Sequence, residues 1–385
     1  MKILSVVGAR PNFIKIAPFA KAISEYNNKN SQNIKHIIVH TGQHYDDKMS
    51  DNFFNDLNIP KPNINLGIGS GTHAEQVGKT MIAFEKVLHT LSPDWVVVVG
   101  DVNASLACSI TAKKERIKCC HIEAGLRSFD MEMPEEINRI VTDRLCDLLL
   151  TPDIISSQNL RIEGVDENKI KFVGNIMIDT LEANRNIAKE LSYNEILKKN
   201  CVDNNSFKLE YFTKNPKYGI ITMHRPSNVD NEIIFNDFVN WFVNKASKKT
   251  PLIWPIHPRT IKQAQKFNLW QKLISCKKIL LLTPLAYHEM LKLNMDAQIM
   301  LTDSGGLQEE CCVLGTPFLT LRKNTERPIT LIKHGGAGYL VGNDISEIKE
   351  KFNSILIQKR KPNKPELWDG KTAERCLIEI INIKQ

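Results

Sequence analysis

Residues 121–145 read HIEAGLRSFDMEMPEEINRIVTDRL, and the rest of the chain is organised around this stretch. It begins at the end of a short apolar strand, which we predict over residues 117–122. Parallel strands of an open α/β sheet place ligands at their carboxyl ends, so Glu123 is expected where chemistry occurs. Pro134 suits the first position of a helix, and Glu135 then lies in the first turn, where the helix dipole favours negative charge.

The predicted helix also carries a charged face. Arg139 and Asp143 follow Glu135 at steps of four residues, so the three side chains share one side of the helix. For Glu136 and Arg144 we prefer the simpler interpretation of surface ion pairs on a capped helix. For Glu123 at the strand end and Glu135 at the helix start we prefer a functional interpretation, because both elements converge on one crevice.

The composition indicates a chain of two or three domains. Its 385 residues are 42% hydrophobic, which is enough to fill sizeable cores. The 51 Lys+Arg residues against 43 Asp+Glu give a net charge of +8, without a basic arm or stripe. Nucleic-acid binding is therefore only weakly indicated, and anionic small molecules fit this charge as well.

The cysteines and the N-terminus point to a cytoplasmic enzyme. The nine cysteines form no CxxC motif, so we expect reduced buried thiols and neither a zinc site nor a disulfide framework. The chain leads from Met1 directly into a short strand and contains neither a signal peptide nor a run long enough to span a bilayer. No membrane association is expected.

The first strand and helix predict an anion site. Residues 2–7 are expected to form a buried strand and residues 12–26 a helix, with Arg10 and Lys15 at their junction. Such junctions bind phosphate through free backbone N–H groups, and two cations strengthen the site. The dinucleotide fingerprint GxGxxG is absent from this junction.

Two further strands of the first half end in polar residues. The strand at 35–40 leads into a turn with His44, which is equally well explained as a ligand contact or as a loop histidine. Residues 94–99 are the clearest buried strand, and Asp101 follows it. Asp101 suits the cap of the next helix, and it falls beside Glu123 if their strands are neighbours.

The second half repeats the alternation of strands and helices. Predicted strands lead into His224, into His257 and into the turn 304–306. This turn precedes a helix, which makes it a second anion site at a helix N-terminus. Glu310 lies in the start of that helix, and its carboxylate is a strong acceptor for a pair of sugar hydroxyls.

The two runs of strand and helix predict an α/β fold. We expect two doubly wound, parallel-sheet, Rossmann-like domains that face each other across a cleft. The N-terminal domain is expected over residues 1–178, joined by a C-terminal helix at 366–385. The C-terminal domain is expected over residues 179–365.

Several motifs distributed over both halves point to one family. GARPNFIK, TGQH, HIEAGLR, PEEINR, MHRP and DSGGLQEE occur in this order along the chain. With these motifs, the chain resembles the non-hydrolysing UDP-N-acetylglucosamine 2-epimerases over nearly its whole length. The resemblance implies the two-domain GT-B fold, a homodimer, a UDP-sugar substrate, and no metal or other cofactor.

The resemblance also implies roles for individual positions. The residues that match the catalytic set are Asp101, Glu123, Glu135 and His224. The residues that match the UDP-binding set are Arg10, Lys15, Ser304, Gly305, Gly306, Glu310 and Arg327. The remaining expected substrate contacts are His44, Arg139, His257, Leu285 and Met290, the last two through backbone or packing.

The implied reaction is the reversible C2 epimerisation of UDP-N-acetylglucosamine to UDP-N-acetylmannosamine, for cell-surface polysaccharide precursors. UDP is eliminated in the anti sense to give a 2-acetamidoglucal and is then added back. The leaving UDP needs cations and helix N-termini, and two proton-transfer groups must address opposite faces of the sugar. The sequence leaves open which acid serves which face, and whether His224 transfers a proton or binds phosphate.

Alternative substrates and activities follow from the same motifs. The TGQHYD and MPEE variants also resemble epimerases that act on UDP-2,3-diacetamido uronic acids. A GT-B glycosyltransferase, a hydrolysing epimerase and a non-catalytic nucleotide-sugar sensor are further alternatives. The three acids of the first half favour work on the sugar itself, and with His224 they argue against a sensor.

Overall fold

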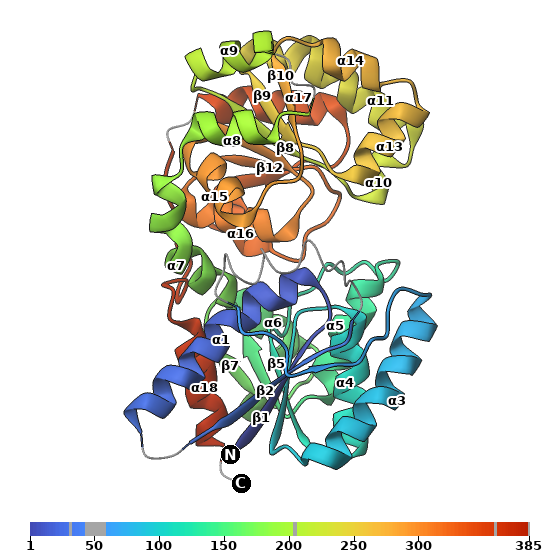
Figure 1. Ribbon diagram of the computed structural model, residues 1–385, viewed down its shortest axis with the longest axis vertical. Helices are drawn as coiled ribbons and strands as arrows, with labels where there is room; N and C mark the ends of the chain where they lie inside the picture. The colour runs from blue at the N-terminus through green and yellow to red at the C-terminus, as the bar shows by residue number, and fades with distance from the viewer. Residues whose placement is uncertain (31–32, 43–58, 203–205, 358–359, 384–385) are drawn as a thin grey trace. The chain divides into compact units, whose positions relative to one another are not determined.

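The computed structural model, which describes residues 1–30, 33–42, 59–202, 206–357 and 360–383, folds into two compact α/β units (Figure 1). Unit 1 comprises Met1–Ala183 and Pro365–Gln385, and unit 2 comprises Asn184–Lys364. The first boundary falls after residue 183, inside helix α7 (Ile176–Glu190), whereas we expected it after residue 178.

Unit 1 is built on a seven-stranded sheet whose strands all run parallel. In sheet order these strands are β3 (Ile64–Asn65), β2 (Lys35–His40), β1 (Lys2–Val7), β4 (Trp95–Val99), β5 (Lys118–Ile122), β6 (Leu148–Thr151) and β7 (Ile170–Phe172). The helices are α1 (Arg10–Lys29), α3 (His73–Leu91), α4 (Asn103–Lys114), α5 (Pro134–Leu145), α6 (Ile154–Ile162), the start of α7, and α18 (Thr372–Asn382). The strand order reverses between β1 and β4, which is the position where open α/β sheets bind ligands.

The neighbouring strands β4 and β5 bring two predicted site residues to one edge of the sheet. All five residues of β4, WVVVV, are buried, as is typical of a parallel strand covered on both faces. Val99 pairs with Ile122 in the register of the two strands. Asp101 and Glu123 therefore follow adjacent strand ends, which confirms the predicted neighbourhood of their strands.

The C-terminal helix α18 belongs to unit 1 and packs against α1, as the red and blue helices of Figure 1 show. Its first backbone N–H groups donate to the carboxylate of Asp179 on α7, from Thr372 at 3.0 Å and from Ala373 at 2.7 Å. Trp368, just before the helix, donates its indole N–H to the carbonyl oxygen of Pro152 at 2.8 Å. Asp179 thus caps a helix nearly 200 residues away in the sequence.

Unit 2 repeats the design with a six-stranded parallel sheet. In sheet order its strands are β10 (Ile279–Leu282), β9 (Leu252–Pro255), β8 (Gly219–Thr222), β11 (Ile299–Thr302), β12 (Phe318–Thr320) and β13 (Gly338–Leu340). Its main helices are α8 (Tyr193–Asn200), α9 (Ser206–Lys214), α10 (Pro226–Val229), α11 (Glu232–Trp241), α13 (Pro258–Lys266), α14 (Trp270–Ser275), α15 (Tyr287–Asp296), α16 (Gly305–Leu314) and α17 (Ile345–Leu356). The order reverses between β8 and β11, so this sheet has its own switch point.

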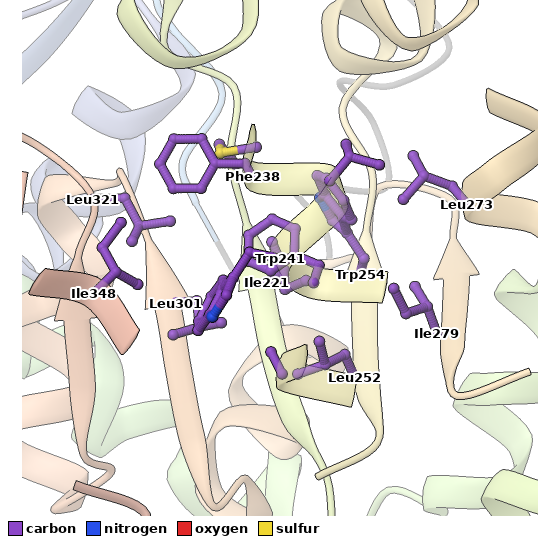
Figure 2. Close-up of a cluster of buried hydrophobic side chains, with 14 of the residues drawn as sticks. Ile221, Phe238, Trp241, Leu252, Trp254, Leu273, Ile279, Leu301, Leu321 and Ile348 are labelled. Carbon is purple, nitrogen blue, oxygen red and sulfur yellow. The ribbon is translucent and has the colours of Figure 1, made fainter. Parts of the chain in front are cut away.

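Aliphatic and aromatic side chains form the core between this sheet and helices α11 and α17 (Figure 2). Trp254 on β9 meets Phe242 edge-to-face, with ring centroids 5.5 Å apart. Trp241 and Phe352 are arranged in the same way at 5.1 Å. Such contacts add to the burial of large apolar surfaces and make the sheet a rigid base for its loops. Both predicted doubly wound parallel sheets are therefore confirmed.

Candidate functional site

The switch point of unit 1 is held together by Asn12, in the first turn of α1. Its side-chain oxygen accepts hydrogen bonds from the backbone N–H groups of Gly8 at 3.2 Å and Ala9 at 2.9 Å. Its amide nitrogen donates to the carbonyl oxygen of Val99 at 2.9 Å. One buried side chain therefore ties the turn after β1 to the end of β4. Asn12 was not among the predicted site residues, although it lies in the GARPN turn.

Lys15, expected at the phosphate site, forms an ion pair with Glu123. The two side chains are almost completely buried. Gly100, at the end of β4, has a φ of +64°, and a Cβ atom there would lie 3.1 Å from the Lys15 ammonium and 3.3 Å from the Glu123 carboxylate. Glycine is thus favoured by its backbone conformation, and a Cβ atom would press closely against the ion pair.

Glu123 itself has a strained backbone. Its φ of +71° lies in the left-handed region, which costs a residue with a side chain about 1–3 kcal/mol. The N–H groups of Glu123 and Ala124 both donate to the carbonyl oxygen of Leu150 at 3.1 Å, and these bonds hold the turn. Strain that a fold maintains in this way is concentrated at functional sites, which supports the role predicted for Glu123.

Asp101 is paired with a buried arginine. The Arg139 side chain is 1% exposed and forms an ion pair with the Asp101 carboxylate through Nη1. Its Nε and Nη2 donate to Glu136 at 2.9 and 2.6 Å, and Nη2 also approaches the Ser128 hydroxyl at 3.3 Å. Arg139 was predicted as a substrate contact, but in the structure it connects other protein groups.

Glu136 corrects the interpretation of this helix. We expected a surface ion pair, but its side chain is 1% exposed and accepts hydrogen bonds from the backbone N–H groups of Ser128 and Phe129. Burial alone would raise its pKa, but these bonds and Arg139 hold the pKa below its usual range. Arg144 is exposed, as expected.

The start of α5 agrees with the prediction. Pro134 is its first residue, and Glu135, which is half-buried, lies in its first turn. The face shared by Arg139 and Asp143 turns inward to Asp101 and to His121. Unit 1 therefore brings together Lys15 of α1 with Asp101 and Glu123, which follow the adjacent strands β4 and β5. Glu135 lies at the start of α5.

Unit 2 pairs His224, after β8, with Asp303, after β11. The Asp303 side chain is fully buried, and it accepts the backbone N–H groups of His224 at 2.9 Å and Arg225 at 2.8 Å. Its other oxygen lies 3.1 Å from Nδ1 of His224. Burial would raise the pKa of Asp303, but the two backbone N–H groups and the nearby imidazole lower it, so the group is a carboxylate.

Asp303 was missed as a site residue. It stands in the DSGG motif, at the end of an apolar strand, where a buried carboxylate needs a partner. Its position after an apolar strand could have identified it as a site residue. Its partner, His224, lies 79 residues away in the sequence, after β8.

His257 lies beside His224, with the ring centroids 5.5 Å apart. It is the N-cap of α13, and its Nδ1 accepts the backbone N–H of Arg259 at 3.1 Å. Burial and the positive charges of His224 and Arg259 lower its pKa. The neutral ring therefore carries its proton on Nε2 and is a donor toward solvent or a ligand.

Arg327 lies against the N-terminus of α16. A Cβ atom at Gly305 would be 2.7 Å from both the Arg327 guanidinium and the Glu326 carboxylate, so a side chain at the first helical residue would displace these groups. Arg327 is buried and ion-paired with Glu309, at 2.8 Å, and with Glu326. Ser304 is the N-cap, so a positive helix end and a fixed guanidinium occur together.

Glu310 lies one residue further along α16 than Glu309 and is buried. Burial and the neighbouring charge of Glu309 raise its pKa to about 7, against an opposing effect of the polar side chains of Tyr287 and Asn294. This carboxyl therefore gains and loses its proton near neutral pH, whereas an ordinary glutamate is ionised there.

The other predicted contacts of unit 2 are less buried. Gly306, the second residue of α16, is partly exposed. Leu285 and Met290 are partly buried and pack against a hydrophobic cluster of this unit. Their contact with the substrate, through backbone or packing, stays a prediction.

His44 and Arg10 are the remaining predicted site residues. His44 lies outside the described residues. Arg10 is the first residue of α1, at the junction where a phosphate site was predicted. In the described parts of the chain, no group of three or more His, Cys, Asp or Glu side chains is arranged to hold a metal ion. No helix of those parts is long and apolar enough to cross a bilayer.

Comparisons with known proteins agree over the whole chain. A family model described as UDP-N-acetylglucosamine 2-epimerase matches residues 27–382. The chain is 42% identical to a UDP-N-acetylglucosamine 2-epimerase of Methanocaldococcus jannaschii, over 98% of each protein. It is 37% identical to a UDP-2,3-diacetamido-2,3-dideoxy-D-glucuronate 2-epimerase of Pseudomonas aeruginosa, over 99% of each.

Solved structures give the same result for the fold. The structure of M. jannaschii UDP-GlcNAc 2-epimerase in complex with UDP-GlcNAc and UDP superimposes with a TM-score of 0.85, at 41% identity and with 100% of both chains covered. The Neisseria meningitidis UDP-GlcNAc 2-epimerase bound to UDP-GlcNAc gives 0.83, at 28% identity and 99% coverage of both.

Proposed function

The chain belongs to the UDP-N-acetylglucosamine 2-epimerase family and is an isomerase, and from this premise we propose that it interconverts UDP-N-acetylglucosamine and UDP-N-acetylmannosamine. The observation that supports this most directly is the placement of Asp101 and Glu123 after adjacent strands, at the switch point of unit 1. Each forms an ion pair with a buried cation, Arg139 and Lys15 respectively. This arrangement suits a reaction on an uncharged sugar ring that develops positive charge at C1.

The proposed mechanism is elimination followed by re-addition. A base removes the C2 proton, the C1–O bond to UDP breaks with its electron pair leaving on the phosphate, and a C1=C2 double bond forms. UDP then returns to C1 while an acid delivers a proton to the opposite face of C2. No carbonyl acidifies the C2 proton, so stabilisation of both developing charges must supply most of the rate.

We assign the proton transfers to Asp101 and Glu135. The side chain of Asp101 is 29% exposed, and Glu135 is half-buried, so both reach solvent and can exchange protons. Glu123 is nearly inaccessible and shares a buried ion pair, which suits stabilisation of positive charge at C1 better than proton exchange.

We assign the UDP leaving group to unit 2. The N-terminus of α16, with Ser304, Gly305 and Gly306, offers backbone N–H groups to phosphate, and Arg327 adds a cation. Glu310 is proposed as the acceptor for ribose hydroxyls. His224, oriented by Asp303, would donate from Nε2 to the diphosphate when it is protonated. Arg10, Lys15 and His257 stay predicted contributors.

The experiment that tests the activity is incubation of the protein with UDP-N-acetylglucosamine alone, followed by proton NMR. We expect a new UDP-N-acetylmannosamine signal and the same final mixture from either direction. Release of UDP with free N-acetylmannosamine would mean a hydrolysing enzyme instead. No change without an added acceptor, followed by glycosyl transfer when one is supplied, would mean a glycosyltransferase.

A second substrate is favoured by one specific relative. The 37% identity to the Pseudomonas aeruginosa enzyme over the full chain makes a UDP-2,3-diacetamido uronic acid the alternative sugar. Parallel turnover assays with the two UDP-sugars at equal concentration decide between them. A kcat/KM that is higher for the uronic acid would replace the substrate proposed here.

The biological setting is also a proposal. A UDP-N-acetylmannosamine product would supply precursors for cell-surface polysaccharides from the cytoplasm, where we expect the enzyme to act as a homodimer. Light scattering after size-exclusion chromatography tests the dimer, and cell fractionation tests the location. Loss of N-acetylmannosamine from the polysaccharide of a deletion strain tests the role.

A further inference from the structure

His121 lies on β5, two residues before Glu123, and its side chain is 0% exposed. Its Nε2 is 3.0 Å from the carbonyl oxygen of Gly100, and its Nδ1 is 2.6 Å from a carboxylate oxygen of Asp143. Both distances are those of hydrogen bonds. A ring rotated by half a turn would place carbon atoms at both positions, so the contacts define the orientation of the imidazole.

Both neighbours of this ring are acceptors. A backbone carbonyl only accepts, and the other oxygen of Asp143 already accepts the backbone N–H of Gly125 at 3.0 Å and Nη1 of Arg127 at 2.7 Å. Burial alone would raise the pKa of Asp143, but His121 and Arg127 hold it below its usual range, so this group is a carboxylate. A neutral imidazole donates through only one nitrogen. Two donated bonds therefore require both ring nitrogens of His121 to carry protons.

The surroundings balance this buried positive charge. Arg127 joins Asp143 to Glu163, which it contacts at 2.7 Å through both Nε and Nη2. His121, Asp143, Arg127 and Glu163 thus form a row of alternating charges with no net charge. Pairing of this kind is what allows an ion to be buried.

The bond from His121 acts on the peptide that precedes Asp101. Gly100 has a φ of +64°, and its carbonyl oxygen is the one that His121 contacts. The carbonyl oxygen of Asp101 itself accepts a hydrogen bond from Asn138 at 2.8 Å, and its carboxylate is paired with Arg139. Asp101 is therefore held at three points by β5 and α5.

We propose that His121, kept as a buried imidazolium, is a positioning residue for Asp101. The proposal rests on the catalytic role proposed above for Asp101, but the charge state of His121 does not depend on that role. The segment 121–145 would then supply the residues that hold Asp101 in place, in addition to Glu123 and Glu135.

The first test is spectroscopic and uses the full-length protein labelled with ¹⁵N in its histidines. We expect two protonated ring nitrogens for His121, as its two hydrogen bonds to acceptors require. The signals are assigned by their absence from a His121→Gln spectrum, or by their change in Asp143→Asn if that variant does not fold. A signal of an unprotonated ring nitrogen for His121 would overturn the proposal.

The second test uses two matched variants. A glutamine at position 121 can place its amide near the position of Nε2 and still donate to Gly100, whereas an asparagine can reach only the position of Nδ1. We expect His121→Asn to lose up to about 100-fold in kcat, as misplaced catalytic groups do, and His121→Gln to retain more. KM and UDP affinity should change much less than kcat in both. His89→Gln, an exposed histidine on α3, is the control and should behave as the unaltered protein.

The outcomes separate the two proposals. Equal kcat losses in the two variants, in proportion to lost thermal stability, would mean a merely structural histidine and would overturn the positioning role. Full activity in Asp101→Asn would remove Asp101 from the mechanism, and the positioning role would fall with it, while the charge of His121 would still be read from the spectrum.

Discussion

Arg139 forms an ion pair with Asp101 from a position that is 1% exposed. The other side of the guanidinium is occupied by Glu136, which in turn accepts the backbone N–H groups of Ser128 and Phe129. One cation thus connects a proposed catalytic carboxylate to the loop before α5. Because these donors bond to protein groups, we propose that Arg139 supports Asp101, and its predicted contact with the substrate stays a prediction.

Replacing Arg139 by lysine keeps the charge but removes the planar fork that bonds two carboxylates at once. We expect a loss of roughly 1–3 kcal/mol in the free energy of unfolding, typical of lost charged hydrogen bonds, together with lower turnover. Denaturant unfolding and the epimerase assay measure the two effects. Arg144→Lys, on the exposed side of the same helix, is the control and should change neither. An Arg139→Lys protein with full turnover would show that Asp101 needs no such partner.

The amide variants Asp101→Asn and Glu135→Gln remove proton-transfer groups while keeping their shape. General acid–base catalysis contributes about 10²–10⁴-fold, so each variant should lose roughly that much turnover. UDP affinity, measured by calorimetry, should be unchanged because neither carboxylate is proposed to bind UDP. Retained turnover in both variants would leave Glu123 and His224 as the pair to test.

Elimination and re-addition also predict the origin of the hydrogen at C2. The acid that delivers it exchanges with solvent, so product formed in deuterium oxide should carry deuterium at C2. Proton NMR of the isolated product measures this directly. Product that keeps the original hydrogen is incompatible with the proposed mechanism, whatever the variants show.

The buried carboxyl of Glu310 should make stability depend on pH. Its pKa of about 7 in the folded state lies above the ordinary value of 4.5, because burial and Glu309 disfavour the charge. The protonated carboxyl therefore contributes fully to the stability of the folded state below pH 4.5, the ordinary pKa. This contribution to the free energy of unfolding is lost as the pH rises toward 7. The loss corresponds to roughly 3 kcal/mol. The difference in thermal stability between Glu310→Gln and the unaltered protein should therefore be larger, in favour of the variant, at pH 8 than at pH 5. The same difference at both pH values would refute the buried charge.

The same group should make UDP binding pH-dependent. If Glu310 accepts ribose hydroxyls, the ligand prefers the carboxylate, so UDP affinity should fall as pH drops below about 7. The phosphate of UDP also titrates and makes the affinity depend on pH. Glu310→Gln measures this contribution, because the variant lacks the Glu310 carboxyl. Calorimetry in buffers of different ionisation enthalpy measures the protons released on binding. Identical pH profiles for the two proteins would remove Glu310 from the ribose site.

Gly305 should be essential for the anion site because its missing side chain leaves room for Arg327. A Cβ atom in Gly305→Ala would lie 2.7 Å from that guanidinium and from Glu326, so both must shift. We expect UDP binding to weaken by roughly 1–3 kcal/mol, the value of a charged hydrogen bond. Gly78→Ala is a matched control in helix α3, where a Cβ atom meets nothing within 4 Å. It should bind UDP normally and gain up to about 1 kcal/mol of stability.

Local chemistry explains which parts of the fold could be predicted. The strand expected at 94–99 is observed as β4, and the one expected at 117–122 as β5. Continuous apolar runs are recognisable in a sequence because burial on both faces of a parallel sheet demands them. Pro134 marked the start of α5 for an equally local reason, since its fixed φ and missing N–H suit the first helical position.

The errors concern side chains whose partners are distant in the sequence. Glu136 has the spacing of a surface ion pair with Arg139, and nothing local reveals that residues 128–129 fold back onto its carboxylate. Asp303 and His224 are 79 residues apart, and each is an ordinary polar residue until β8 and β11 become neighbours.

The sequence by itself therefore determined the two parallel sheets, the family and the chemical groups at the strand ends, because propensity, apolar runs and turn residues act within a few positions. Only the tertiary structure decided which of those groups are paired, buried and charged. Arg139 became a support for Asp101, Glu310 an acid with a pKa near neutrality, and His121 a cation without access to water. These properties depend on desolvation and on partners brought together by the sheet order, and neither is encoded locally.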